Sequence, residues 1–478
     1  MSIPAPRTLP LRLKLVHGLG SIAYGVKDNG FSTFLLIFYN QVLGLQAALV
    51  STALMIALFI DALIDPFIGH LSDRTYSRWG RRLPWLYLAP IPLGLAWLLL
   101  WAPPDAAQGH IFLYLVLTAV LVRALVSCCE VPSVALVPEL TSDYDERTSL
   151  MRFRFLFGWA GGLLMLFLAY SVFLVPDEGH KIGQLNPEGY WSYGLFGGAL
   201  IILAVLLSAL GQHRYVAKWP DHRPAASSFG HAFDEIRQSL SNRAFLVYAS
   251  AAAFAVVSQG ITFSISNYLY IYVWRFDQTA FAIFPVILFL SVIAAFFIVV
   301  PLNRIWDKPH TAAYGSLLGI SFWMVPFVLR LAGYWPETGT AISTWLVFIF
   351  FFLGNCFAVT VMISGSSMIA DIVEDAQEKT GRRTEGVFFA GNFFIQKCAS
   401  GLGIFASGLI ISWAGLSQKT DADDVLVEVV DRLTTAYIGI IFVLALVSAA
   451  IFVRFPIRRH DHEARVRRLA EDTMKQGT

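Results

Sequence analysis

The chain has 478 residues, of which 56% are hydrophobic and only 14% are charged, and its mean hydropathy is +0.61. Soluble domains carry about a quarter charged residues, so this composition excludes an ordinary soluble protein and indicates an integral membrane protein. The net charge of +2 argues against a nucleic-acid partner, which would need a strongly basic surface.

The hydropathy pattern predicts twelve membrane spans, each long enough to cross a bilayer, which takes roughly 20 residues. In chain order they lie near residues 16–43, 47–70, 83–102, 110–138, 152–175, 191–211, 244–272, 280–301, 311–332, 342–369, 386–414 and 433–454. We therefore expect an all-α integral membrane protein with two six-helix bundles. Paired bundles of this kind are typical of secondary carriers, whose substrate site lies at the bundle interface near the midplane.

The longest polar connection separates the sixth span from the seventh. It divides the chain into a first bundle, a linker, a second bundle and a basic tail, over residues 1–211, 212–243, 244–455 and 456–478. Within the linker, an apolar residue recurs at helical spacing at Phe229, Phe233, Ile236 and Leu240. This spacing predicts an amphipathic helix on the membrane face or on the bundle, and an ordinary linker helix is the simpler interpretation.

The distribution of Lys and Arg predicts the orientation of the chain. Most of them lie in alternate connections and at the two ends, and only five fall in the opposite set of connections: Lys181, Arg275, Arg330, Lys419 and Arg432. Positively charged connections stay on the cytoplasmic side, so we expect a multi-pass protein of the inner (plasma) membrane with both termini in the cytoplasm. The basic tail is expected to face anionic membrane lipid.

Seven ionisable side chains lie at or near the centres of the predicted spans. They are Lys27, Asp28, Asp61, Asp65, Arg123, Glu130 and Lys397. Each costs about 2.5–3.5 kcal/mol to insert, so the set costs roughly 20 kcal/mol before pairing, more than the net stability of a typical protein. A buried ion-pair network that only holds helices together explains one or two pairs, most readily that of Arg123. Seven charges in a carrier-like bundle favour a function in transport.

The stretch FIDALIDPFIG, residues 59–69, places Asp61 and Asp65 one turn apart on the same face of the second span. Two carboxylates this close should not both stay charged in an apolar interior without a cation or a proton between them. A hard cation would use both carboxylates together with a hydroxyl, whereas a proton would need only one acid. The presence of both acids favours Na⁺ slightly and leaves H⁺ open.

Two other spans present polar faces at mid-depth. On the fourth span, Arg123, Ser127 and Glu130 fall at i, i+4 and i+7 and share one face. On the eleventh span, Asn392 and Gln396 stand beside the one deep lysine of the second bundle, and we expect them to contact the solute. An acidic first bundle and a basic group on the second could meet around a bound cation and a hydroxylated solute.

Four stretches of the sequence resemble those of one transporter family. They are YGVKDNGF (24–31), FIDALIDPFIGHLSDRTYSRWGRRLPW (59–85), CEVPSVALVPELTSDYDERTSLMRFR (129–154) and MIADIVEDAQEKTGRRTEGVFFAGNFFIQK (368–397). In this order they resemble the glycoside–pentoside–hexuronide:cation symporters of the major facilitator superfamily, the family of the melibiose carrier. The resemblance covers essentially the whole chain and implies the major facilitator fold.

The resemblance also implies a role for each matching residue. The coupling cation, Na⁺ or H⁺, would be held by two acids and a hydroxyl, Asp61, Asp65 and Ser127. The sugar would be contacted by a second set, Lys27, Asp28, Glu130 and Arg154. Lys397 matches a lysine beside the cation site, and we assign it, together with Arg123, to coupling between the halves.

Three positions depart from the pattern of the sugar carriers. Val134 and Met362 stand where those carriers have aromatic residues, one of which packs on the sugar, and Glu130 replaces an aspartate. The glutamate places its carboxylate about one methylene further into the cavity. These changes argue against a galactoside, and they leave open a bulkier solute such as the lysophospholipid carried by a distant branch of the family.

Two charged cytoplasmic segments are predicted to form the inner gate. The first follows the second span and contains Asp73 and Arg81. The second lies at the pseudo-symmetric position of the other bundle and contains Asp371, Glu374, Arg383 and Glu385. Ion pairs between the two segments would close the inner face. A role in topology alone is a real alternative for Arg78 and Arg82.

The sequence thus predicts a cation-coupled symporter for a sugar, glycoside or sugar acid. We expect a monomer that contacts membrane lipid and needs no cofactor. A carrier of lysophospholipid or another amphiphile is the main alternative. A non-transporting receptor would not need the acid pair and Lys397, and a channel would need a continuous polar pore. An enzyme has least support, because the sequence contains no nucleophile–base pair or metal-ligand set.

Overall fold

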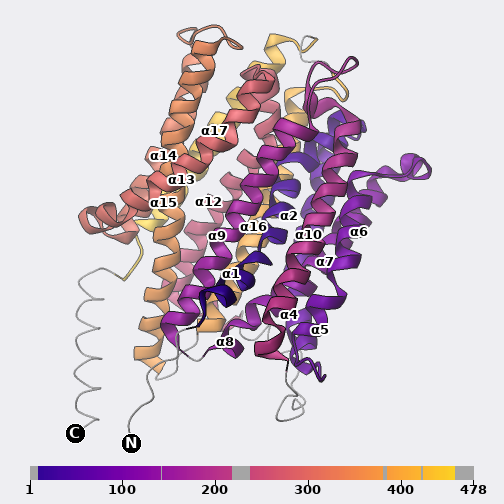
Figure 1. The fold of residues 1–478 in the computed structure, drawn as a ribbon. Helices are drawn as coiled ribbons and strands as arrows, with labels where there is room; N and C mark the ends of the chain where they lie inside the picture. The colour runs from indigo at the N-terminus through magenta and orange to yellow at the C-terminus, as the bar shows by residue number, and fades with distance from the viewer. Residues whose placement is uncertain (1–8, 142, 218–236, 381–384, 421–423, 458–478) are drawn as a thin grey trace, which may run out of the picture.

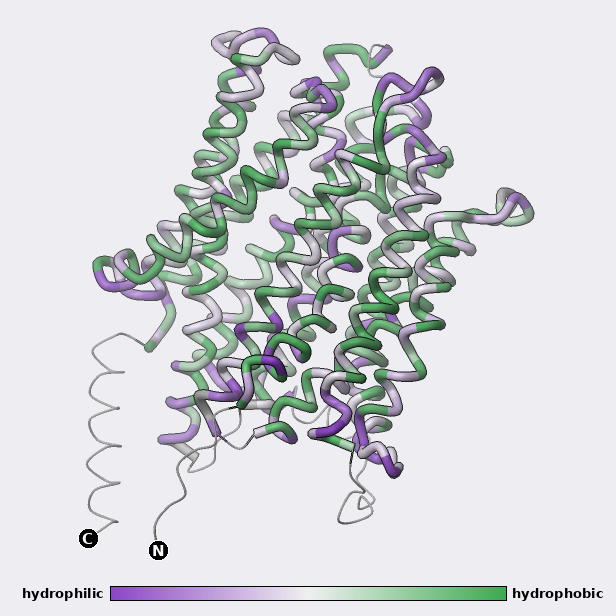
Figure 2. Tube along the Cα trace, in the orientation of Figure 1, coloured by the Kyte–Doolittle hydropathy of each residue, from purple (hydrophilic) through white to green (hydrophobic). Residues whose placement is uncertain are grey.

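The structure is a computed structural model that describes residues 9–141, 143–217, 237–380, 385–420 and 424–457. These residues form helices and no strand, and the helices stand side by side as one bundle (Figure 1). Hydrophobic residues run along the helices, and hydrophilic ones gather mainly at the two ends of the bundle (Figure 2). The predicted all-α membrane fold is therefore confirmed.

Ten helical segments of the described chain are long and apolar enough to cross a membrane. They are built on α4 (Ala47–Arg74), α7 (Ile111–Ala135) with α8 (Val137–Leu140), α9 (Tyr144–Leu168) with η4 (Ala169–Phe173), α10 (Pro187–Val216), α12 (Arg243–Tyr268) with η6 (Leu269–Val273), α13 (Gln278–Trp306), α14 (Lys308–Leu331), α15 (Ala341–Thr380), α16 (Glu385–Ala414) and α17 (Val427–Phe452). Two short 3₁₀ segments, η3 (Asp105–His110) and η5 (Gly183–Leu185), lie in connections.

The first and third predicted spans are interrupted helices, so ten of the twelve predicted spans are continuous in the described part of the chain. The first consists of α1 (Leu11–Leu19), α2 (Ile22–Asn29), η1 (Gly30–Phe34), α3 (Leu35–Ile37) and η2 (Phe38–Val42), of which η1 and η2 are π-helical. The third consists of α5 (Leu83–Leu88) and α6 (Pro90–Trp101). It breaks at Pro90 because proline has no N–H to continue the hydrogen-bond ladder.

We refer to the described residues 9–217 as the first half and to residues 237–457 as the second half. The helix α10 continues to Val216, and α12 begins at Arg243. The proposed amphipathic helix of the linker falls largely on residues 218–236, and the basic tail on residues 458–478, and both lie outside the described residues. The exact limits of the two bundles therefore stay a prediction.

Glycines allow close helix packing within each half. A Cβ on Gly25 of α2 would lie 1.9 Å from the carbonyl oxygen of Gly158 on α9, and one on Gly94 of α6 would lie 2.9 Å from that of Gly198 on α10. Small residues of this kind let helix backbones approach in a membrane, where apolar burial alone does not favour helix pairing. In the second half, Gly319 of α14 likewise allows a close approach to α15.

The two halves meet along a seam between α4 and α16, which run in opposite directions. Ser51 of α4 packs against Gly408 of α16, and Leu58 packs against Gly401 further along. We call the face of the bundle that carries the η2–α4 and α16–α17 connections the upper face. The lower face carries the α4–α5 and α8–α9 connections (Figure 1).

Candidate cation and substrate site

Both acids of the second span lie on α4, at the middle of the seam between the halves. Asp61 is 2% exposed, and the side chain of Asp65, one turn closer to the lower face, is 28% exposed. The α-helix places them on one face because residues four apart lie almost above each other. A proline, Pro66, directly follows Asp65 within this helix.

Ser127 of α7 lies between the two acids. Its hydroxyl oxygen is 2.9 Å from Oδ1 of Asp61 and 2.6 Å from Oδ1 of Asp65. A hydroxyl has one proton and can donate to only one of these oxygens at a time. The other carboxylate oxygen then faces the lone pairs of the hydroxyl. Three oxygens that converge in this way form an arrangement that a proton on one acid, or a hard cation among them, would stabilise.

Lys397 of α16 reaches the same acids from the other half. Its ammonium nitrogen is 2.9 Å from Oδ2 of Asp61 and 2.5 Å from Oδ2 of Asp65. The lysine therefore bridges both carboxylates across the seam. Breaking such a buried pair by removing one partner is costly, because it leaves an uncompensated charge.

Arg123 of α7 completes the cluster. Its Nη1 lies 3.4 Å from Oδ2 of Asp61, and the guanidinium carbon lies 4.4 Å from the centre of the Phe31 ring, as in a cation–π contact. Two carboxylates and two basic groups give a cluster with no net formal charge. This compensation explains how four charges can be buried at the middle of a membrane bundle.

The candidate solute-binding acids lie next to this cluster. Lys27 and Asp28 form an ion pair on α2 with 2.6 Å between Nζ and Oδ1; the lysine is buried, whereas the side chain of Asp28 is 63% exposed. Glu130 is half-buried on α7, close enough to interact with the charges of Lys27 and Lys397. An exposed carboxylate at the middle of the bundle can accept hydrogen bonds from a hydroxylated solute.

The other predicted solute-binding residues are more enclosed. Arg154 of α9 is buried, donates to the hydroxyl of Ser133 at 2.6 Å and lies 5.5 Å from the ring centre of Tyr24. Asn392 of α16 is buried, and Gln396 is half-buried one turn above it, next to Lys397. Arg154 thus supports the wall formed by α2 and α7.

The two positions without aromatic residues are both exposed. Val134 follows Arg123, Ser127 and Glu130 along one face of α7, and it is 37% exposed. Met362 of α15 is 43% exposed. These aliphatic side chains occupy the places where the resemblance to sugar carriers predicts aromatic rings.

The seam between the halves is closed above the charged cluster. Tyr268 of α12 donates to the Asn40 carboxamide oxygen at 2.9 Å, and Gln41 of η2 donates to the Ser417 carbonyl at 3.0 Å. Aromatic rings also meet across the halves, since the centres of Tyr170 and Phe281 are 4.9 Å apart. The bonds are uncharged and mostly buried, so the upper side is sealed by many neutral contacts.

Further toward the lower face, the contact between α4 and α16 opens. Lys397, Gly401 and Gly408 mark the stripe of α16 that touches α4. Phe393 and Phe389 continue this stripe by one and two turns, and they are 48% and 40% exposed. Together with the exposure of Asp28, this indicates that the site is reached from the lower side.

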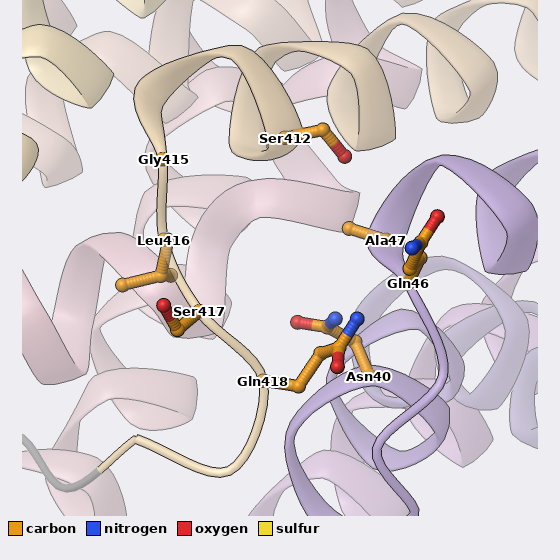
Figure 3. A pocket seen from close by; sticks show the side chains of 8 residues that line it. All are labelled: Asn40, Gln46, Ala47, Ser412, Gly415, Leu416, Ser417 and Gln418. Carbon is orange, nitrogen blue, oxygen red and sulfur yellow. The ribbon is translucent and has the colours of Figure 1, made fainter.

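A separate pocket lies on the upper face between the halves (Figure 3). It has a volume of about 420 Å³ and is lined by Asn40, Gln46, Ala47, Ser412, Gly415, Leu416, Ser417 and Gln418. Asn40 belongs both to its wall and to the hydrogen bonds that seal the seam. The pocket therefore marks the outer limit of the closed region.

The predicted gate residues make ion pairs within their own halves. Asp73 pairs with Arg82, Arg81 pairs with Glu139 at 3.1 Å, and Asp371 accepts two bonds from Lys308 at 2.6 and 2.8 Å. Glu374 lies on α15 in the same region. Arg383 and the side chain of Glu385 lie outside the described residues. Pairing between the two segments stays a prediction.

The site also uses residues that sequence reasoning missed. Phe31 packs on Arg123, and Ser133 and Tyr24 hold Arg154. Tyr24 and Phe31 frame the YGVKDNGF stretch, and Ser133 follows Glu130 by three positions, so their places in the motifs were a usable signal. In contrast, Glu139 as the partner of Arg81 carries no signal in sequence spacing.

The site lies in a seam between two halves and contains a cluster of compensated charges. This arrangement is typical of a membrane carrier. A sequence profile of one family, described as MFS/sugar transport protein, matches residues 16–459. The chain belongs to this family. The MFS protein is similar, at 27% identity over 94% of each chain, to an uncharacterised symporter of Synechocystis sp..

Two further comparisons agree with this assignment. The protein is 24% identical to a putative glycoside/cation symporter of Escherichia coli, over 98% of this chain and 95% of the relative. Its fold is similar to that of the xylose transporter of E. coli in an inward open conformation, with a TM-score of 0.62 at 14% identity, over 93% and 96% of the two chains. The major facilitator fold is thus shown, and the protein is a multi-pass membrane transporter.

Proposed function

We propose that this MFS protein is a symporter of the inner membrane that couples Na⁺ or H⁺ to the uptake of a sugar, glycoside or sugar acid by alternating access. The observation that carries the proposal is the position of Lys397, whose ammonium bridges Asp61 and Asp65 across the seam between the halves. The similarity to a putative glycoside/cation symporter supports both the coupling and the solute class.

The cation and Lys397 would compete for the same carboxylates. The cluster of Asp61, Asp65, Arg123 and Lys397 has no net formal charge, so a bound Na⁺ would add an uncompensated positive charge while the lysine remains. Cation binding is therefore expected to release Lys397 from the first half. Because the ion pair joins the two halves, its release changes the contact that holds them together, which couples the ion to the rocking motion.

A proton would act through the same contacts. If one of the two acids is protonated, the Ser127 hydroxyl can donate to one carboxylate and accept from the other acid, so both short contacts become favourable. The charge on the pair then falls by one, and the attraction for Lys397 falls with it. The mechanism thus works with either ion, and the choice between them has to be measured.

The solute would bind next to the cation, between α2, α7 and α16. Asp28 and Glu130 supply acceptors for hydroxyl groups, and Lys27 supplies a donor beside them. A solute with several hydroxyls uses such groups in pairs, as a sugar does. The carboxylate of Asp28 is exposed, and the solute would reach it from the lower side. We assign the lower side to the cytoplasm because the basic connections lie there.

A second solute class is favoured by Val134 and Met362. Both are aliphatic and exposed where an aromatic platform would stack on a sugar ring. Apolar side chains at these two positions suit the hydrocarbon part of an amphiphile. We therefore retain an amphiphile carrier, with the same cation site, as the second candidate.

The deciding experiment is a counterflow screen with purified protein in proteoliposomes. Sugars, glycosides, uronic acids and lysolipids are tested as competitors, with and without Na⁺ and at two pH values. Competition by a hydroxylated solute that strengthens with Na⁺ or acid pH supports the proposal. Competition by lysolipids alone selects the amphiphile carrier, and a screen in which no solute exchanges would contradict transport itself.

A further inference from the structure

The π-helical turn η1 of the first span lies between the charged cluster and the closed upper seam. In this turn the N–H of Leu35 donates to the carbonyl of Gly30, five residues earlier. The turn packs directly on Trp97, because a Cβ on Gly30 would lie 2.3 Å from that indole ring. Single π turns of this kind are frequent at functional sites.

One residue of the turn contacts the cation site. Phe31 is 1% exposed, and its ring lies under the guanidinium of Arg123, whose Nη1 faces Asp61 at 3.4 Å. The Phe31 ring also contacts Trp97, at 6.4 Å between centres. The position of Arg123 beside Asp61 therefore depends on the position of Phe31.

Another residue of the same turn holds the second half. The carboxamide of Asn267 on α12 is fully buried and donates to the carbonyl of Thr33 at 2.8 Å. Its oxygen accepts a bond from the hydroxyl of Tyr170 at 2.8 Å. Both ends of this one carboxamide are thus bound to the first half, on two different spans, and an opening of the upper side must break both bonds.

We propose that the turn Gly30–Phe34 transmits the state of the cation site to the upper seam, with Phe31 and Asn267 as positioning residues. The inference rests on the proposed cation coupling and adds the element through which the ion controls access. Binding of a cation at Asp61 weakens the attraction for Arg123, which changes the contact of the guanidinium with Phe31. A shift of the turn by one residue toward α-helical register rotates the carbonyl of Thr33 about the helix axis by about 100°, away from Asn267.

The test reads the opening of the upper side with a single cysteine. Ser51 of α4 is buried against Gly408 in the upper seam, so Ser51→Cys reports when this seam opens. Its rate of labelling by a membrane-impermeant maleimide is measured in the full chain with and without Na⁺ and at neutral and acid pH. The parent chain, which has four cysteines within its membrane segments, gives the background.

In the parent reporter, addition of the coupling ion is expected to raise the labelling rate. Asn267→Leu removes both buried bonds and should raise the rate without the ion about 5- to 150-fold, the equilibrium factor of two net hydrogen bonds. Phe31→Leu removes the ring under Arg123 and should abolish the response to the ion. Phe31→Tyr keeps the ring and should restore the response, which a loss of packing alone would not predict.

A matched control lies in the same seam but outside the turn. Tyr268→Phe removes the bond to Asn40 and should raise the basal rate while the response to the ion remains. If Phe31→Leu responds to the ion like the parent, or if Asn267→Leu labels like the parent, the turn does not transmit the signal. If the parent reporter responds to neither Na⁺ nor H⁺, the coupling proposal and this inference both fail. If the parent responds but the variants behave like it, this inference alone fails, so the two failures are distinguishable.

Discussion

The ammonium of Lys397 lies 2.5 Å from a carboxylate oxygen of Asp65, although the two residues are 332 positions apart and belong to opposite halves of the bundle. This ion pair joins α16 to α4 at the depth where the seam changes from closed to open. A cation that competes for Asp65 would therefore act directly on the contact between the halves. The geometry leads to five predictions.

Asp61→Asn and Asp65→Asn should each abolish cation-driven uptake. An amide cannot carry the negative charge that holds a cation or a dissociable proton, and the Asn variants keep the shape of the side chain. Solute exchange at equal concentrations should remain partly intact, because the solute contacts other residues. The measurement is uptake against exchange in proteoliposomes. Asp105→Asn, in the upper connection, is the matched control, and unchanged uptake by either site variant would remove the acid pair from the mechanism.

Lys397→Val should abolish accumulation of solute against a gradient while the protein still folds into the membrane. The empty carrier would then hold two acids with only Arg123 to compensate them, and it would not reorient readily. The loss of a competing ammonium should also strengthen Na⁺ binding, so Na⁺ should raise the melting temperature of the variant more than that of the parent. A variant that accumulates solute like the parent would show that Lys397 has no role in coupling.

Ser127→Ala should raise the Na⁺ concentration for half-maximal uptake by about tenfold, which corresponds to the loss of one charge-assisted contact. Ser133→Ala is the control on the same helix, because its hydroxyl contacts Arg154 and not the acid pair. It should change the solute concentration for half-maximal uptake and leave the Na⁺ dependence unchanged. Equal effects of both variants on the Na⁺ dependence would point to a general disturbance of α7.

Asp28→Asn should weaken solute binding about tenfold or more, because one charge-assisted hydrogen bond contributes about 1.5–3 kcal/mol. Cation binding should survive, since Asp28 pairs with Lys27 and does not touch Asp61 or Asp65. The two affinities can be measured separately by calorimetry. Equal loss of solute and cation binding would indicate that Asp28 acts through the structure of α2.

Gly25→Ala should destabilise the first half by about 1–3 kcal/mol, because its Cβ would overlap the carbonyl oxygen of Gly158. Gly439→Ala is the control, since a Cβ at Gly439 of α17 meets no atom within 4 Å. That substitution should be neutral or stabilising by up to about 1 kcal/mol, as expected for alanine in a helix. The melting temperatures of the two variants are measured by thermal unfolding in detergent. Equal melting temperatures would contradict the close contact of α2 with α9.

The residues of the cation site could be identified from the sequence because each carries a local signal. Asp61 and Asp65 stand out as charges in an apolar run, and Ser127 shares a helical face with Arg123. Helical periodicity and the cost of burying charge are properties of short segments, so they can be recognised without the fold. The same reasoning placed Lys397 in a polar stripe, but it did not show that one ammonium bridges both acids.

Other features depend on helices that meet only in the folded bundle. The first span is interrupted by π turns, one of which packs on Trp97 and is bound by Asn267 of the second half, whereas the hydropathy pattern reads it as one continuous span. Arg81 pairs with Glu139 within its own half, where charge pattern alone suggested a partner across the gate.

The sequence by itself determined that this chain crosses a membrane many times and buries a compensating set of charges. Hydropathy and charge are properties of each segment of the sequence, so they can be read without the fold. Only the tertiary structure decided which side of the seam is closed. That choice rests on bonds such as Asn267 to Thr33 and Tyr268 to Asn40, which join residues more than 200 positions apart. Neutral side chains of this kind leave no periodic trace in a sequence, since their energy depends on the exact distance to a partner on another helix.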